Sequence, residues 1–288
     1  MFVKNNSSNV VFEYFYSKLN DIFSQREIRQ ITKQVILKRC NWDESQWILN
    51  KNHTFSESDL LYFRSVLKDL LNGKPFQYIL KESYFYNLTL KVDERALIPR
   101  PETEELVDLI IKENKEENLK VLDIGTGTGC IPLALKNANN SWEISAFDVD
   151  EAAVQLAKEN ATLNQLAIHI EKLDILNESN WKFCDGESFD VIVSNPPYIL
   201  KEEADNMAKH VVEFEPHIAL FVENDPLIFY RKIAEFAKKY LKQGGKLYFE
   251  VHENYAKDVY QLLDTYHFKN ICIFKDLQGK DRMISAIN

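Results

Sequence analysis

Three glycines at alternate positions, Gly125, Gly127 and Gly129, follow a short apolar stretch that contains an aspartate, Asp123. Glycine allows a turn to take positive φ angles and lets a ligand approach bare backbone. The next apolar stretch ends in Asp148, 23 residues after Gly125. A carboxylate at that place can accept hydrogen bonds from both hydroxyls of a ribose. The spacing therefore predicts a site for a ligand that contains a nucleoside.

Two classes of ligand suit such a loop. A dinucleotide fold uses the spacing Gly-x-Gly-x-x-Gly and places a pyrophosphate at a helix N-terminus, whereas this loop reads Gly-x-Gly-x-Gly behind an acidic residue. That acidic residue suits an amine-bearing ligand better than a diphosphate. S-adenosylmethionine carries a ribose, an amino group and a sulfonium, so we expect it as the cofactor; a plain glycine-rich turn is the alternative. The residues expected to hold it are Gly125, Thr126, Gly127, Thr128, Gly129 and Asp148.

A second unusual motif, Asn195-Pro196-Pro197-Tyr198, follows the apolar stretch 189–194. Two prolines remove two backbone donors and fix φ near about −65°, so the corner offers carbonyl oxygens, and Asn195 adds a side-chain acceptor. Such a neutral site suits an NH2 group on an sp2 carbon, because acceptors on both hydrogens can aim the nitrogen lone pair at a methyl donor. Tyr198 would give a flat face to the planar group. We predict that residues 195–198 are catalytic and bind the substrate; a proline-stiffened turn is the alternative.

The elements that must position these motifs alternate between strand and helix. Apolar stretches predict strands at 119–124, 143–148, 169–174 and 189–194, and a helix is expected at 225–245, between Asp-Pro and Gly-Gly. This alternation predicts an α/β fold with a doubly wound, mostly parallel, Rossmann-like sheet. Ligands of such sheets bind at the carboxyl ends of the strands. The glycine loop and the Asn195 corner should therefore face each other.

The N-terminal part has a different character. Residues 1–73 show apolar side chains at helical spacing, and Ser24 with Glu27 forms a capping-box start. Residues 82–92 alternate between apolar and polar types, as a strand or short hairpin does. We expect three parts: a small all-α substrate-recognition domain at 1–80, a β-hairpin and linker at 81–100, and a cofactor-binding catalytic domain at 101–288.

Composition narrows the classes of function. The 288 residues are 45% hydrophobic and 27% charged, with a net charge of −9, which argues against a protein whose main task is to grip nucleic acid. Residues 1–80 carry a net charge of +3 and the remainder −12, so the N-terminal part is the better candidate for docking a partner. No stretch predicts a membrane span, a secretory signal or a metal site, and the four cysteines are far apart. We expect a cytoplasmic monomer without direct contact to nucleic acid.

The two motifs together resemble class I S-adenosylmethionine-dependent amino-methyltransferases. Further segments narrow the resemblance: GKPFQYIL at 73–80, ALIPRPETEELV at 96–107, the Glu-Pro and Ala-Leu pairs within 215–220, and KDLQGKDR at 275–282. With them, the chain resembles the HemK/PrmC peptide chain release factor N5-glutamine methyltransferases. The PRPETE segment discriminates, because the NPPY motif is shared with DNA adenine methyltransferases.

This resemblance implies a substrate and further site residues. The implied partners are class I peptide chain release factors, and the implied acceptor is the side-chain nitrogen (N5) of the glutamine in their Gly-Gly-Gln loop. The Asn195 side chain and the Pro196 carbonyl would clamp this amide. Asn195 would also touch the cofactor, and Asp174 or Ile175 would lie near its adenine. The positions implied along the substrate cleft are Arg100, Pro101, Thr103 and Glu104.

Three other functions stay open on the residues alone. An amino-methyltransferase acting on adenine or guanine of nucleic acid would use the same corner, but it needs a basic groove and a flipped base, which the acidic body does not favour. A nicotinamide oxidoreductase is disfavoured by the glycine spacing and has no use for residues 195–198. A domain that only binds a partner is disfavoured by the two intact motifs.

Overall fold

The computed structural model describes residues 6–50 and 53–288 and divides the chain into two compact units. One unit holds residues up to Lys81 together with Lys209–Phe214, and the other holds Glu82–Ala208 and Glu215–Asn288. Residues 1–5 and 51–52 of the expected helical domain lie outside the described residues.

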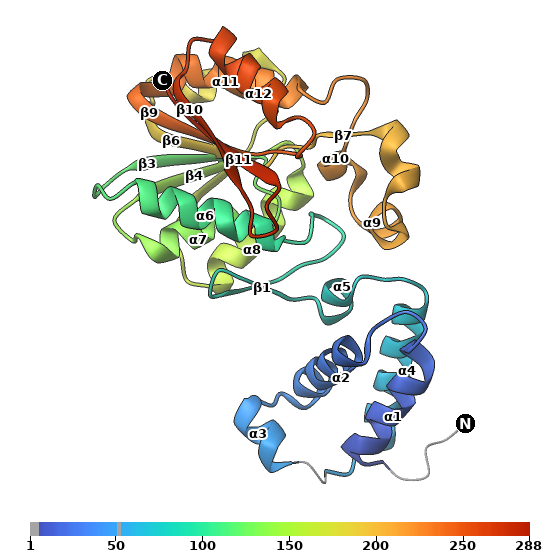
Figure 1. Ribbon diagram of the computed structural model, residues 1–288. Helices are drawn as coiled ribbons and strands as arrows, with labels where there is room; N and C mark the ends of the chain where they lie inside the picture. Colours follow the sequence, from blue (N-terminus) through green and yellow to red (C-terminus); the bar gives the residue numbers. More distant parts are fainter. Residues whose placement is uncertain (1–5, 51–52) are drawn as a thin grey trace. The chain divides into compact units, whose positions relative to one another are not determined.

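The first unit is helical, as the sequence predicts. The Ser24 hydroxyl accepts the N–H of Glu27 at 3.3 Å, and the Glu27 carboxylate accepts the N–H of Ser24 at 2.8 Å, so the predicted capping box is present. A shared apolar core buries side chains that include Phe15, Ile36 and Leu67. The helices of this unit are α1 (Ser8–Leu19), α2 (Gln25–Cys40), α3 (Glu44–Leu49), α4 (Glu57–Leu71), α5 (Phe76–Leu80) and α9 (Lys209–Phe214) (Figure 1).

A short antiparallel hairpin opens the second unit and confirms the predicted strand pair. Strand β1 (Ser83–Phe85) pairs with β2 (Leu88–Leu90). Their buried side chains Phe85, Leu88 and Leu90 join the core under helix α6 (Pro101–Glu113). That helix begins at Pro101, because a proline fits the first helical turn, where its missing N–H would have had no partner.

Seven strands form the central sheet in the order β10-β11-β9-β6-β3-β4-β5. The chain moves outward from β3 to β5 and then returns to β6, so the topological switch lies between β3 and β6. Strand β11 runs antiparallel to both of its neighbours, and the pairs from β9 to β5 are parallel. The mostly parallel, doubly wound sheet is thus confirmed. The strands are β3 (Lys120–Ile124), β4 (Glu143–Asp148), β5 (His169–Lys172), β6 (Phe189–Ser194), β9 (Leu241–Glu250), β10 (Lys269–Lys275) and β11 (Asp281–Ile287).

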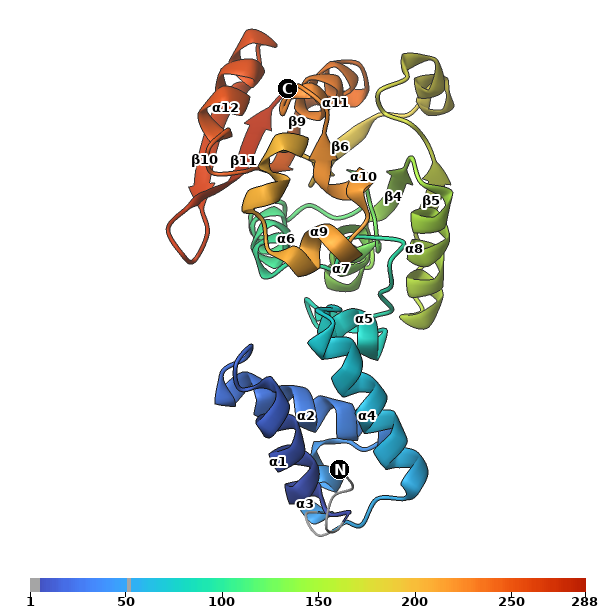
Figure 2. The same ribbon diagram turned by 90° about the vertical axis from the view of Figure 1, so that its right-hand side faces the viewer.

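Helices cover both faces of this sheet (Figures 1 and 2). Successive side chains of a strand point to opposite faces, and in β3 this places Val121 in the core under α6 and α7, and Leu122 in the core under α11 and α12. Helix α8 packs its Val154 and Ala157 against the β4 and β5 side. The covering helices besides α6 are α7 (Cys130–Ala138), α8 (Glu151–Leu163), α11 (Ile228–Tyr240) and α12 (Ala256–Thr265).

The helix predicted for 225–245 ends earlier than the Gly-Gly pair suggested. Helix α11 ends at Tyr240, and both glycines lie inside β9. A Cβ on Gly245 would approach the Leu241 side chain to 2.9 Å and the Asp190 carbonyl oxygen to 3.0 Å. This glycine therefore serves the close pairing of β9 with β6, not the end of the helix.

The sequence did not predict the short elements between β5 and α11. They are η1 (Glu178–Cys184), β7 (Ile199–Leu200), η2 (Lys201–Asn206), α10 (His217–Leu220) and β8 (Phe221–Val222), in addition to α9. Among the helices of the described residues, none has the length and apolar character that a membrane crossing needs.

Candidate active site

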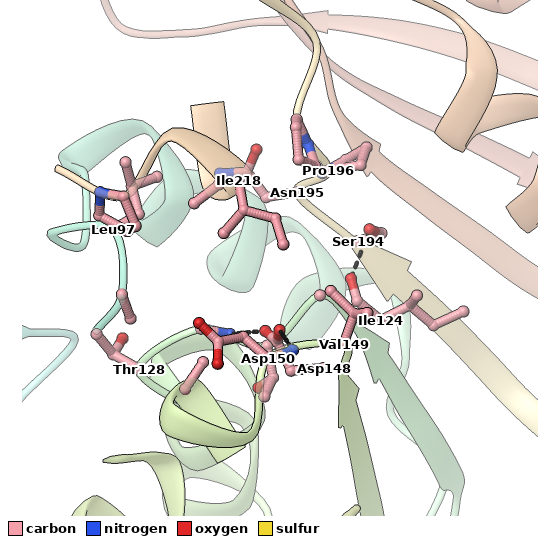
Figure 3. A pocket seen from close by; sticks show the side chains of 18 of the residues that line it. Leu97, Ile124, Thr128, Asp148, Val149, Asp150, Ser194, Asn195, Pro196 and Ile218 are labelled. Atoms are coloured by element: carbon pink, nitrogen blue, oxygen red, sulfur yellow. Dashed lines mark hydrogen bonds between the residues drawn. The ribbon is translucent and has the colours of Figure 1, made fainter. Parts of the chain in front are cut away.

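A cavity of about 310 Å³ opens at the carboxyl ends of β3, β4 and β6. In Figure 3, Asn195 and Pro196 lie on one side of it, and Asp148, Asp150 and Thr128 lie on the other. The two motifs therefore face each other at the topological switch, where open α/β sheets bind their ligands. Its wall takes residues from the segments 95–100, 124–131, 148–153, 173–176, 194–197 and 216–219, with Thr103, Phe229 and Ile233.

The glycine loop is tied to β4 on its inner side and open on its outer side. The N–H groups of Gly125 and Thr126 both donate to the Phe147 carbonyl oxygen, each at 2.9 Å. Gly125 and Gly127 take φ angles of +77° and +53°, where residues with a Cβ are strained. A Cβ built on Gly125 would meet no described atom within 4 Å. The loop thus leaves free space for a ligand over its backbone.

Asp148 is held in place and still has acceptor capacity. One carboxylate oxygen accepts the N–H of Gly127 at 2.8 Å, and the other accepts the N–H of Asp150 at 3.0 Å. Burial raises the pKa of Asp148, and these two hydrogen bonds oppose the rise. A carboxylate offers about four acceptor positions. The remaining positions are available to the two hydroxyls of a ribose.

Asp123 lies on β3, two residues before the loop, with its side chain completely buried. Within the described part of the chain, neither carboxylate oxygen has a hydrogen-bond partner, and the hydroxyls of Thr126 and Thr128 lack one as well. Burial raises the pKa of Asp123 to about 7. Orphaned polar groups of this kind are rare in protein interiors. Thr126 and Thr128 line the cavity, whereas Asp123 lies beneath the loop, so the two threonine hydroxyls are the unused polar groups nearest to a bound ligand.

Asp174 and Ile175 line another edge of the cavity, just after β5. The Asp174 carboxylate accepts the N–H of Leu176 at 2.9 Å, and the Ile175 carbonyl oxygen accepts the indole N–H of Trp181 at 3.0 Å. These anchors fix an apolar surface with one carboxylate beside it. Such an edge suits a planar base that carries an amino group.

The Asn195 corner begins where β6 is fastened to β3. The buried Ser194 hydroxyl donates to the Ile124 carbonyl oxygen at 2.6 Å, which locks the ends of the two strands together. Asn195, Pro196 and Pro197 then line the cavity. The Asn195 amide nitrogen donates to the Thr103 hydroxyl oxygen at 3.4 Å. The corner therefore has a fixed base, and the nitrogen side of its amide is engaged by the protein.

Four of the residues expected in the cavity lie outside the wall that the described residues form: Gly129, Pro101, Glu104 and Tyr198. A Cβ on Gly129 would lie 3.2 Å from that of Ala157, so this glycine allows α7 to pack closely on α8. Pro101 starts α6. The Glu104 carboxylate accepts the N–H of Tyr86 at 2.8 Å and ties α6 to the hairpin.

Tyr198 lies outside this wall, although its three predecessors line it. Its ring packs against His252, with 5.7 Å between the ring centroids. Burial raises the pKa of Tyr198 to about 12, so the phenol is neutral at physiological pH. In this arrangement the ring supports the corner from behind, and its predicted contact with a substrate stays a prediction.

An ion pair joins two segments of the wall. The Arg100 guanidinium lies 2.6 Å from the Glu215 carboxylate, whose side chain is completely buried. The second carboxylate oxygen accepts the N–H of Ile98 at 3.2 Å. A buried carboxylate is tolerated when charge and hydrogen bonds compensate it. The pair therefore fixes the segment Ile98–Arg100 against the segment that begins at Glu215.

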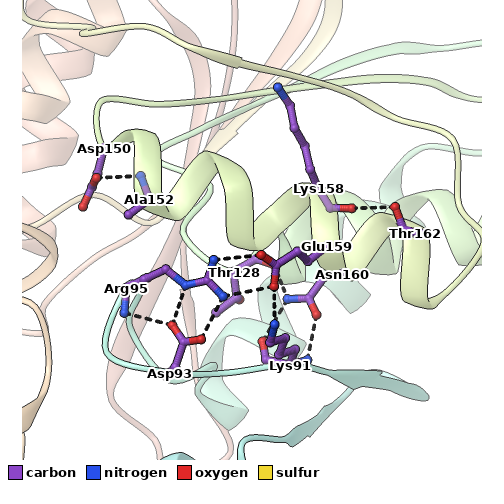
Figure 4. A network of polar contacts seen from close by, with 10 residues as sticks. All are labelled: Lys91, Asp93, Arg95, Thr128, Asp150, Ala152, Lys158, Glu159, Asn160 and Thr162. Atoms are coloured by element: carbon purple, nitrogen blue, oxygen red, sulfur yellow. Dashed lines mark hydrogen bonds and ion pairs between the residues drawn. The ribbon is translucent and has the colours of Figure 1, made fainter.

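Asn160 is a structural determinant of the loop that the sequence analysis did not identify (Figure 4). Its side chain, fully buried on α8, accepts the N–H of Lys91 at 2.7 Å and donates to the carbonyl oxygens of Lys91 and Thr128, each at 2.9 Å. It thus joins three segments: the exit of the hairpin, the glycine loop and α8. The available signal was a polar residue at an apolar position, four residues after Leu156.

Comparison with known proteins identifies the family. Residues 103–217 match the methyltransferase small domain, and residues 16–80 match the PrmC N-terminal domain. The chain is 42% identical to the release factor glutamine methyltransferase of Flavobacterium psychrophilum over 278 residues. This alignment covers 94% of this chain and 96% of that protein. The chain belongs to the release factor glutamine methyltransferase family. The release factor glutamine methyltransferase of Streptococcus pneumoniae is also 42% identical, over 86% of this chain and 87% of that protein.

Solved structures share the fold at much lower identity. A methyltransferase from Pyrococcus furiosus aligns with a TM-score of 0.50 and 17% identity, over 69% of this chain and 88% of that one. The 16S rRNA N2 G1207 methyltransferase of Thermus thermophilus, solved with AdoMet and guanosine, also gives a TM-score of 0.50 and 17% identity, over 72% of this chain and 49% of that one. These two likenesses show the fold alone.

As a release factor glutamine methyltransferase family member, the chain is an S-adenosylmethionine-dependent methyltransferase. The residues present fit this cofactor: an open glycine loop, the free acceptor positions of Asp148, and the unpaired hydroxyls of Thr126 and Thr128 in the cavity wall. When bound, the cofactor supplies an activated methyl group on a positively charged sulfur. Across the cavity, the Asn195 corner offers neutral oxygen acceptors, which can hold a neutral amide.

Proposed function

We propose that this enzyme transfers a methyl group from S-adenosylmethionine to the side-chain nitrogen N5 of the glutamine in the Gly-Gly-Gln loop of class I peptide chain release factors. The observation that carries the proposal is the 42% identity, over 94% of the chain, to a protein named release factor glutamine methyltransferase. The cavity supports it with a nucleoside-sized cradle on one side and an amide-binding corner on the other.

The corner explains how a poor nucleophile can react. An amide nitrogen is weakly nucleophilic, because its lone pair is delocalised into the carbonyl group. We infer that the Asn195 side-chain oxygen and the Pro196 carbonyl oxygen accept the two hydrogens of the glutamine NH2 group. Two fixed acceptors turn the nitrogen lone pair toward the methyl donor, and proximity and orientation together can supply about 7–11 kcal/mol in well-aligned reactions.

Proton transfer makes little demand on the protein. Once methylated, the nitrogen carries an extra proton and becomes acidic enough to release it to water, so a strong general base is not required. Near the corner, the Arg100 charge is compensated by Glu215, and the Tyr198 phenol is neutral because burial raises its pKa to about 12. The residues around the substrate amide therefore act by hydrogen bonding and shape.

We also propose that the N-terminal helical unit recognises the release factor. Its residues 16–80 match the PrmC N-terminal domain, and residues 1–80 carry a net charge of +3, in contrast to −12 for the remainder. A net positive charge suits a partner that itself works on the ribosome.

The test is methylation of a release factor by the full chain with labelled cofactor, followed by mass analysis of the Gly-Gly-Gln peptide. We expect one added methyl group on wild-type release factor and none on its Gln→Ala loop variant. Asn195→Ala should lower kcat by about 100-fold, in the range seen when one group that stabilises a transition state is removed. The affinity for S-adenosylhomocysteine should change little.

Asn137→Ala is the matched control, because Asn137 is exposed on α7. It should behave as wild type. Label that persists on the Gln→Ala release factor would overturn the proposed acceptor. Label on adenine or guanine of added RNA or DNA, but not on the release factor, would favour the nucleic acid alternative.

A further inference from the structure

A buried carboxylate lies behind the Asn195 corner. Glu250 is the last residue of β9, next to β6 in the sheet, and it is 3% exposed. Its carboxylate accepts the Thr103 hydroxyl at 2.7 Å, and the Thr103 oxygen in turn lies 3.4 Å from the Asn195 amide nitrogen. Thr103 is also 3% exposed. Three side chains from β9, α6 and the end of β6 thus form one chain of hydrogen bonds.

The chemistry of these groups determines which atom donates the proton in each of the two hydrogen bonds. An ionised carboxylate accepts hydrogen bonds and cannot donate them, so the single hydroxyl proton of Thr103 goes to Glu250. The Thr103 oxygen is then left as an acceptor, and it must receive a proton from its other neighbour. In Asn195 only the NH2 side of the amide has protons to give. The amide oxygen must therefore point to the opposite side.

Burial raises the pKa of Glu250 to about 7, and the Thr103 hydrogen bond, the Arg282 charge and a hydrogen bond from the Asn195 side chain oppose this rise. The carboxylate is therefore predominantly ionised at a mildly alkaline assay pH. In this state Glu250 accepts the hydroxyl proton of Thr103, and Thr103 accepts from Asn195. A buried carboxylate is costly to a protein. Its place behind the corner calls for a role that an apolar residue could not fill.

We propose that Glu250 and Thr103 are positioning residues that hold the Asn195 amide with its oxygen toward the substrate. The inference rests on the proposed function, because it assumes that the substrate offers an NH2 group to this oxygen. A reversed Asn195 amide would present its own NH2 group instead. Two donors would then face each other, and the substrate nitrogen would lose the acceptor that orients it.

The Thr103 hydroxyl can be removed with little change of shape. Thr103→Val replaces the hydroxyl by a methyl group, and Thr103→Ser keeps the hydroxyl as the matched control. We expect Thr103→Val to lower kcat about 10- to 100-fold, with the dissociation constant of S-adenosylhomocysteine within twofold of wild type. Thr103→Ser should keep kcat within about threefold. Equal kcat values for the two variants would overturn the proposal.

A purely structural role of the Glu250–Thr103 pair is separated by a double variant. In the Asn195→Ala background, Thr103→Val should have no further effect on kcat, because the group that it positions is already missing. Independent losses that multiply in the double variant would contradict the positioning role. Thermal unfolding of each protein checks that the single variants are folded at the assay temperature.

A readout that needs no turnover keeps this inference separate from the proposed function. In protein labelled with ¹⁵N-asparagine, the side-chain NH2 signals of Asn195 can be assigned by their loss in Asn195→Ala. We expect these signals to shift in Thr103→Val and to remain near the wild-type position in Thr103→Ser. Unchanged signals in Thr103→Val would refute the hydrogen-bond chain, whereas a release factor that is not methylated by wild type would refute the proposed function alone.

Discussion

Replacement of Asn160 by alanine should both destabilise the catalytic unit and weaken cofactor binding. The Asn160 amide makes three hydrogen bonds, two to the backbone of Lys91 and one to the carbonyl oxygen of Thr128, at 2.7–2.9 Å. One intramolecular hydrogen bond contributes about 1 kcal/mol net, and a buried partner left alone costs about 1–3 kcal/mol. With one fully buried bond among the three, the free energy of unfolding should fall by roughly 3–4 kcal/mol.

Thermal unfolding measures this loss. For a domain of about 150–250 residues, 1 kcal/mol shifts Tm by roughly 2–4 °C, so we expect Asn160→Ala to lower Tm by roughly 6–16 °C. The relevant transition is the one that S-adenosylhomocysteine shifts upward, because the ligand binds the catalytic unit. Calorimetry should also show a weaker affinity for this ligand, since Thr128 is part of the cavity wall.

Two further variants make the test specific. Thr162→Ala removes an exposed hydroxyl on the same helix, which donates to the Lys158 carbonyl oxygen at 3.0 Å, and it should change stability by less than about 0.5 kcal/mol. Asn160→Asp keeps the shape and the acceptor but loses both donors, so it should be at least as harmful as alanine. A Tm of Asn160→Ala within about 1 °C of wild type would refute the role of Asn160 in holding the loop.

The remaining predictions concern three carboxylates of the catalytic unit. Asp148→Asn should weaken S-adenosylhomocysteine binding about 10-fold or more in calorimetry, because a charged acceptor contributes about 1.5–3 kcal/mol per hydrogen bond; an unchanged affinity would speak against the ribose role. For Asp123, burial raises the pKa from 3.8 to about 7, so the folded protein retains a proton that the unfolded chain has lost. The stabilisation that this bound proton gives is complete below about pH 4 and disappears toward pH 7. The Tm of wild type minus the Tm of Asp123→Asn should therefore fall between about pH 5 and pH 7. A difference that does not change with pH would contradict the raised pKa of Asp123. Glu215→Gln weakens the pair with Arg100, whose side chain is 34% exposed, so we expect a loss of about 1–3 kcal/mol in thermal unfolding, and a more stable variant would show that the pair serves no structural purpose.

The core of the fold and the two motifs could be predicted because their signals are local. A strand buried on both faces reads as a continuous apolar run, and β6 has the predicted bounds, 189–194. The glycine loop and the Asn195 corner were recognisable from residue types alone. That the loop and the corner face each other across one cavity then follows from the rule that ligands bind at the carboxyl ends of parallel strands.

The parts that escaped prediction depend on contacts between residues far apart in sequence. The segment that carries η1, η2 and α10 has short elements without a long apolar period, and Glu215 is fixed by Arg100, 115 residues earlier. Glu250 and Asn160 are single polar residues in apolar surroundings, and their partners cannot be read from spacing. Tyr198 belongs to a recognisable motif, yet its ring packs against His252 and the core, 54 residues away in the case of His252, and not along the cavity wall.

The path of the backbone between the two units limits how the enzyme can be re-engineered. The chain crosses from one unit to the other after Lys81, after Ala208 and after Phe214. Helix α9 thus belongs with the N-terminal helices, and a Cβ on Gly73 would lie 3.9 Å from the Phe214 ring. A chimaera that exchanges only the leading helices between two relatives would pair them with a foreign α9. Transplanting this unit therefore requires two grafts, made together.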